Sequence, residues 1–139
     1  MRTELYPRSQ IDIVVRIVQD DGGREAAAIN AVTLALIDAG IAVKDYVVAV
    51  AGGFIAGSAV VDLNHVECTM AGGPVIPLAI YPHTKEIVFL QQEQKLPLEH
   101  VEAVLALATD CCLVLFDKMR EAVTDRTRAM VASRGVFVG

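Results

Sequence analysis

Hydrophobic and polar positions in the first forty residues predict a strand followed by a helix. Residues 11–18 are mostly β-branched, and Asp12 and Arg16 fall on one face at even spacing, as in a β-strand. The segment 20–25 supplies turn glycines and acidic first-turn residues. The run 26–39 is uninterrupted helix-forming sequence that ends before Gly40. Because this run is apolar on nearly every side, we expect a central, buried helix.

Four more strands and a long helix are predicted after this helix. Strands at 46–54 and 59–63 flank a turn that contains Gly57, which predicts a hairpin. Residues 75–81 and 86–91 form a second pair, and Pro77 places its first strand at a sheet edge or at a bulge. From Leu98, apolar residues recur at helical spacing and predict one long amphipathic helix over the sheet. The predicted order is β-α-β-β-β-β-α, an α+β fold built from α/β layers.

Composition narrows this picture to one domain that spans residues 1–139. The chain is 54% hydrophobic with only 5% aromatics, which favours tightly packed helix-on-sheet layers. Its net charge of −5 repels nucleic acid overall, so that any RNA contact must be local or shared with partners. An odd number of cysteines without C-x-x-C spacing favours a reduced intracellular protein. The first residues lack a signal-peptide core and no run is long enough to cross a bilayer, so we expect no membrane association.

Several ordered motifs resemble the second half of ribonuclease PH domains. They are Leu5-Tyr-Pro-Arg-Ser-Gln-Ile-Asp-Ile13, Gln19-Asp-Asp-Gly-Gly23, Leu36-Ile-Asp-Ala-Gly-Ile41, Val61-Asp-Leu-Asn-His-Val-Glu67 and Ala71-Gly-Gly-Pro74. Within this family the motifs are most similar to eukaryotic ring subunits of the RNA exosome. The resemblance implies a topology like that of ribosomal protein S5 domain 2. It also implies that the chain holds the C-terminal half of such a domain and lacks the N-terminal half.

The resemblance directs attention to a phosphate-binding loop at the start of the predicted helix. Active members of the family use phosphate to attack the 3′ end of RNA, and they begin this helix with Asp-Gly-Gly-Thr-Arg. Here Asp21, Gly22 and Gly23 match, whereas Arg24 and Glu25 replace the Thr and the phosphate-binding Arg. The Glu25 carboxylate opposes an incoming phosphate, although Arg24 could still contact RNA. The glycines either make a turn only or keep a residual anion site.

A second element implied by the resemblance is a pair of metal-binding aspartates six residues apart. Cys68 and Pro74 stand at these two positions. Proline has no side-chain ligand, and thiolate prefers softer metals than Mg²⁺. Asp62 and Glu67 are nearby carboxylates, but alternation along an extended segment would place them on opposite faces. We therefore expect neither a metal site nor a cofactor.

These observations predict a non-catalytic structural subunit of the exosome core ring. By resemblance it would support 3′→5′ RNA processing and degradation, ribosomal RNA maturation included, in the nucleus, nucleolus and cytoplasm. Its partners would be other ribonuclease PH-type subunits in a hetero-oligomeric ring, and single-stranded RNA in the shared channel. One alternative is a phosphorolytic exoribonuclease whose site is shared with a partner subunit, and another is a homo-oligomeric module unrelated to RNA. The apolar face of the helix at 26–39 also predicts self-association of the isolated chain.

Overall fold

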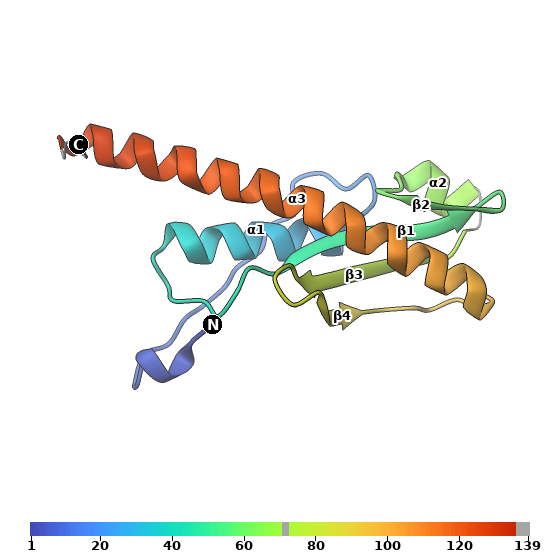
Figure 1. The fold of residues 1–139 in the computed structure, drawn as a ribbon, viewed down its shortest axis with the longest axis horizontal. Coiled ribbons are helices and arrows are strands. Elements are labelled where there is room, and N and C mark those ends of the chain that lie inside the picture. Colours follow the sequence, from blue (N-terminus) through green and yellow to red (C-terminus); the bar gives the residue numbers. More distant parts are fainter. Residues whose placement is uncertain (71–72, 136–139) are drawn as a thin grey trace.

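The computed structural model describes residues 1–70 and 73–135, which form an antiparallel sheet with helices packed against it (Figure 1). The elements are η1 (Thr3–Leu5), α1 (Arg24–Asp38), β1 (Val48–Ile55), β2 (Ser58–Val61), α2 (His65–Met70), β3 (Val75–Tyr81), β4 (Glu86–Leu90) and α3 (Leu98–Ser133). The strand order in the sheet is β2-β1-β3-β4. The predicted α+β class, the four later strands and the two long helices are confirmed. Only Ala26 and Thr33 of α1 are buried, however, so the prediction that this helix is central and buried is wrong.

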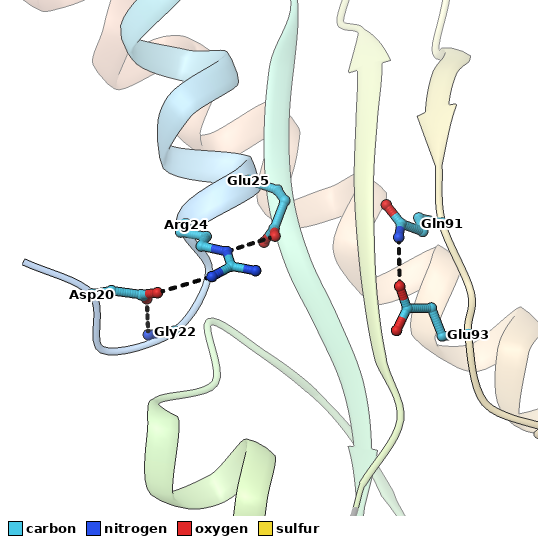
Figure 2. Close-up of polar contacts among 6 residues, drawn as sticks. All are labelled: Asp20, Gly22, Arg24, Glu25, Gln91 and Glu93. Carbon is cyan, nitrogen blue, oxygen red and sulfur yellow. Dashed lines mark hydrogen bonds and ion pairs between the residues drawn. The ribbon is translucent and has the colours of Figure 1, made fainter. Parts of the chain in front are cut away.

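Helix α3 covers one face of the sheet, and α1 lies along the outer edge of β1, where Ala26 packs on the other face. Side chains alternate along a strand, and consecutive residues of β1 pack accordingly: Val48 lies in one cluster with Cys112 of α3, and Ala49 lies in another with Ala26 of α1. Figure 2 shows α1 beside β1, at the edge of the sheet, with α3 behind the sheet. Helix α1 also reaches α3, because Leu34 packs against the cluster that contains Cys112.

The first half of α3 supplies the larger core. Its fully or almost fully buried residues Val104, Ala108, Cys112 and Met119 form one stripe facing the sheet. A Cβ atom added to Gly52 of β1 would lie 2.7 Å from Val104 Cγ1, so that the glycine permits this close approach.

The second half of α3 extends beyond the sheet (Figure 1). There the helix meets the C-terminal end of α1, where Arg126 Nε lies 3.4 Å from Asp38 Oδ1. No helix in the described part of the chain combines the length and the apolar character that a membrane span requires.

Side chains of α1 complete the outer edge of β1, because β2 is too short to cover it. Strand β2 pairs with β1 only from Gly52 onward. Before that point, the Asn30 amide accepts the N–H of Ala49 and donates to its carbonyl, both at 2.8 Å. The Thr33 hydroxyl donates to the carbonyl of Val47 at 2.8 Å. Two polar side chains of α1 thus make the hydrogen bonds that a neighbouring strand would otherwise make with β1.

Pro77 lies in an interior strand, so the prediction that it marks a sheet edge is wrong. The carbonyl of Pro77 accepts the N–H of Gln91, while the carbonyl of the opposite residue, Ala51, accepts the N–H of Asp62. The polar groups of this opposed pair therefore point away from each other, and β1 and β3 lose no hydrogen bond at the proline. The register irregularity between β3 and β4 falls two residues further along.

The prediction of a strand at residues 11–18 is also wrong. The segment runs beside α1 without joining a sheet, and its backbone makes no hydrogen bond to the backbone of the described residues (Figure 1). A β-ladder needs a neighbour with free N–H and C=O groups, and none of the described residues supplies one beside this segment. The alternation survives in the exposure, however: Val14 and Val18 are 90% and 92% exposed, whereas Ile13, Val15 and Ile17 are about half exposed.

Candidate functional site

Gly22 and Gly23 make the sharp turn into α1. Their φ angles are +106° and +64°, in the region that favours glycine. A Cβ atom on Gly22 would overlap the carbonyl oxygen of Leu63, so this position also requires the absence of a side chain. The Gly22 N–H donates to Asp20 Oδ1 at 3.0 Å, and no side chain caps α1. The backbone conformation therefore explains why both positions are glycine, whether or not the loop binds an anion.

The guanidinium group of Arg24 is engaged by two carboxylates of its own loop. Its Nε donates to Glu25 Oε1 at 2.9 Å, and its Nη1 lies 3.5 Å from Asp20 Oδ2 (Figure 2). The hydrogen bond between Arg24 and Glu25 raises the pKa of the arginine and lowers that of the glutamate. Exposed ion pairs contribute little to stability, but here they surround the cation with negative charge. The Gln91–Glu93 pair after β4, also drawn in Figure 2, makes no marked contact with this group.

A third carboxylate, that of Asp62, faces the same helix start. Asp62 follows β2 with φ +59°, and its N–H donates to the carbonyl of Ala51 at 2.8 Å. A Cβ atom on Gly23 would lie 3.8 Å from Asp62 Oδ1. This carboxylate lines a cavity of about 310 Å³ between α1, β1 and α3, which Cys111 and Leu115 also line. A carboxylate at a helix N-terminus occupies the electrostatic position that a bound anion would take.

Helix α2, which the sequence analysis did not predict, begins with a reciprocal capping box. The N–H of Asn64 donates to Glu67 Oε2, and the N–H of Glu67 donates to Asn64 Oδ1, both at 2.9 Å. The N–H of His65 lies 3.4 Å from Asp21 Oδ1 and ties α2 to the loop before α1. Glu67 is thus already used to cap a helix. The Asn-x-x-Glu spacing was the signal that could have revealed α2.

The two positions that correspond to metal-binding aspartates lie in different elements. Cys68 is on α2, where burial and then the charges of Glu67 and Asp20 raise the pKa of its thiol. Pro74 lies just before β3, and its carbonyl oxygen would be 3.1 Å from a Cβ atom on Gly53. The fold therefore brings Cys68 near Asp20, in the loop that starts α1, and places the Pro74 carbonyl beside β1.

The carboxylates of this region make other contacts. Within residues 1–70 and 73–135, no group of three or more His, Cys, Asp or Glu side chains is arranged to hold a metal ion. Of the motif that ends at Pro74, Ala71 and Gly72 lie outside the described residues. Asp62 faces the cavity and Glu67 caps α2, so these carboxylates do not form a pair in the cavity.

Sequence models of one family match most of the chain. The model of the 3′ exoribonuclease family, domain 1, matches residues 1–42, and the model of domain 2 matches residues 45–111. The chain belongs to the 3′ exoribonuclease, or ribonuclease PH, family. The loop 22–25 lies in the domain 1 match, whereas Asp62 and Cys68 lie in the domain 2 match. The candidate site is therefore where the two family domains meet.

Relatives within the ribonuclease PH family carry exosome names. The chain is 41% identical over 128 residues to "Exosome complex component RRP41 homolog" of Arabidopsis thaliana, covering 92% of this chain and 53% of the relative. It is 49% identical over 106 residues to "Exosome complex component RRP41" of Homo sapiens, covering 76% and 43%. It is 37% identical over 133 residues to "Exosome complex component ski6" of Schizosaccharomyces pombe, covering 96% and 54%. The chain spans about half the length of these relatives.

Proposed function

We propose that this chain is a structural, non-catalytic subunit of an exosome core ring. The names and identities of its relatives support membership of an exosome. In this proposal the chain pairs with other ribonuclease PH-type subunits and helps to form a channel for single-stranded RNA. It supports 3′→5′ RNA processing and degradation, including ribosomal RNA maturation, in the nucleus, nucleolus and cytoplasm. Like its relatives, it would act as part of a complex.

The observation that carries the non-catalytic part is the pairing of Arg24 with Glu25 and Asp20. A phosphorolytic site must hold a phosphate dianion, and it does so with free cations and backbone N–H groups. Here the nearest guanidinium is neutralised by two carboxylates, and Asp62 adds a third negative group. Phosphate entering this loop would have to displace an existing ion pair and approach uncompensated carboxylates.

A phosphorolysis assay on the assembled ring tests the loss of activity. We expect a ring made from this chain and its ribonuclease PH-type partners to release no nucleoside diphosphates from RNA in a phosphate-dependent manner. The double variant Arg24→Thr, Glu25→Arg restores the family motif and should raise phosphate affinity, seen as phosphate protection in thermal melting. Glu121→Gln on the exposed face of α3 serves as a charge-matched control, because both changes add one positive charge in total.

The alternative is an active site that this chain shares with its partner. The start of α1 favours it, since the N-cap residue Gly23 has no side chain that could accept the first N–H groups of the helix. Phosphate-dependent release that disappears in Asp62→Ala would establish this alternative and overturn our proposal. Glu67 is unsuitable for this test because its replacement also removes the α2 cap. Membership is tested separately: co-purification should recover related ring subunits, and a free monomer without them in cell extract would contradict it.

A further inference from the structure

An aspartate and a histidine join two loops at one end of the sheet. His83 lies in the turn between β3 and β4, and Asp45 lies in the segment that leads from α1 into β1 (Figure 1). Their side chains meet at 2.7 Å, from His83 Nδ1 to Asp45 Oδ1. The same Asp45 oxygen accepts the N–H of Tyr46, also at 2.7 Å. We propose that this pair is a pH-sensitive latch, which holds the segment before β1 to the β3–β4 turn more firmly when His83 is protonated.

The two side chains of the latch differ in exposure. The Asp45 side chain is only 16% exposed, whereas that of His83 is 66% exposed. Phe116 of α3 packs edge-on against the His83 ring, with 5.3 Å between the ring centroids. Tyr46, the titratable residue next to Asp45, packs edge-on against the same Phe116 at 5.1 Å. The carboxylate is thus held in place, while the imidazole keeps contact with the water from which it takes up a proton.

Protonation of His83 changes its contact with Asp45 from a hydrogen bond of a neutral ring into an ion pair. A carboxylate only accepts hydrogen bonds, so a neutral His83 must carry its single proton on Nδ1 to make this contact. A protonated imidazole has a proton on each nitrogen and adds a full positive charge. Hydrogen bonds of charged groups are roughly twice as strong as those of neutral groups. Because histidine changes its charge between about pH 5 and 8, the latch tightens as the pH falls through this range and loosens as it rises.

Asp45 has a stronger effect on His83 than the other charged groups around the pair. Those other groups are exposed: Lys44 beside Asp45, Lys85 and Glu86 beside His83, and Asp117 and Arg120 on α3. The Arg120 guanidinium lies 5.8 Å from the centre of the Phe116 ring, and its Nη2 lies 3.3 Å from Asp117 Oδ1, which offsets its charge. Water and salt screen exposed charges, whereas the Asp45 carboxylate is largely buried and touches the imidazole directly.

The latch holds the link between the two family domains. The match to domain 1 ends at residue 42, and the match to domain 2 begins at residue 45, which is Asp45 itself. This link connects α1 to β1, and the pair with His83 ties it to a turn of domain 2. A tighter latch therefore fixes the link against the β3–β4 turn, so that the joint between the domains responds to pH.

NMR spectroscopy of the 139-residue chain tests the contact directly. The Tyr46 N–H reports on Asp45 Oδ1, because it shares this oxygen with His83. Between about pH 5 and 8, we expect the Tyr46 amide resonance to shift with the same midpoint as the His83 ring resonances. His83→Gln should abolish this shift, because glutamine does not change its charge. A Tyr46 resonance that does not follow His83 in the wild-type chain would overturn the latch.

Urea unfolding at pH 5.5 and pH 8 measures how much the latch contributes. His83→Gln should raise the equilibrium constant for unfolding about two- to tenfold more at the lower pH, the size expected for a charged hydrogen bond at a largely exposed ring. Asp45→Asn should remove the same pH dependence, although its amide oxygen can still accept the Tyr46 N–H. His65→Gln on α2 is the matched control, since this histidine is also exposed but lies outside the latch.

The outcomes separate this inference from the proposed function. Equal effects of His83→Gln at the two pH values, or the same acid-dependent loss in His65→Gln, would each overturn the latch. His83→Gln changes an exposed side chain, so it keeps the test decisive even if Asp45→Asn does not fold. None of these measurements involves RNA, phosphate or exosome subunits. The latch and the proposed function can therefore fail independently of each other.

Discussion

Replacing Asn30 with alanine tests whether a helix side chain substitutes for a missing strand. The change removes the two hydrogen bonds of 2.8 Å that the N–H and the carbonyl of Ala49 make with Asn30. Ala49 is buried, so water cannot readily replace them. Each buried group that loses its hydrogen bond costs about 1–3 kcal/mol, and alanine returns roughly 0.5 kcal/mol through its higher helix propensity. We therefore expect Asn30→Ala to lower the free energy of unfolding by about 2–5 kcal/mol. This is a large share of the roughly 5–15 kcal/mol typical of whole domains.

Urea unfolding followed by circular dichroism measures this loss. Asn30→Asp should be intermediate, because its carboxylate still accepts the Ala49 N–H but no longer donates to the carbonyl. Ala31→Asn, one position along on the exposed side of α1, is the control and should cost only about 0.5 kcal/mol of helix propensity. If Asn30→Ala and Ala31→Asn change stability equally, then the edge of β1 does not depend on α1, and our account of this edge is wrong.

Two further predictions concern a glycine and a thiol. Gly22→Ala should destabilise the fold by roughly 3 kcal/mol or more, because it combines a positive φ with overlap against the Leu63 carbonyl. Gly57→Ala also has a positive φ but meets no neighbour, so it should cost about 1–2 kcal/mol. Thermal melting of the two variants measures the difference. Burial raises the pKa of Cys112 to about 12, so at pH 8 its thiol should resist a disulfide reagent until the protein unfolds, while the partly exposed Cys111 reacts. Modification of Cys112 in the folded state, detected by peptide mass spectrometry, would contradict that environment.

The spacing of apolar residues along this sequence predicts its longer strands and helices well. Residues 75–81 were predicted as a strand and form β3 with the same bounds, because their apolar side chains fill both faces of an interior strand. The start of α3 at Leu98 also agrees, since its apolar stripe continues without interruption. Alternation and helical spacing report burial directly, and these elements are held by burial.

Features that depend on a partner or on one hydrogen bond were not predictable in the same way. Residues 11–18 have the pattern of a strand, but a pattern cannot show whether another strand lies next to it. Helix α2 is too short for a periodic signal, and only the Asn64–Glu67 box indicated it. At the candidate site, the replacements could be identified from the motif, but the pairing of Arg24 with Glu25 and Asp20 required coordinates.

The length of α3 has a consequence for how the molecule opens. Up to Met119 the helix is anchored by buried side chains; from there to Ser133 none of its residues is buried, and it contacts the end of α1. The free energy of local opening must therefore fall along a single helix, from that of global unfolding to that of an isolated helical end. The first turns of α3 belong to the cooperative folding unit, whereas its last turns can unwind and re-form many times during the lifetime of one folded molecule.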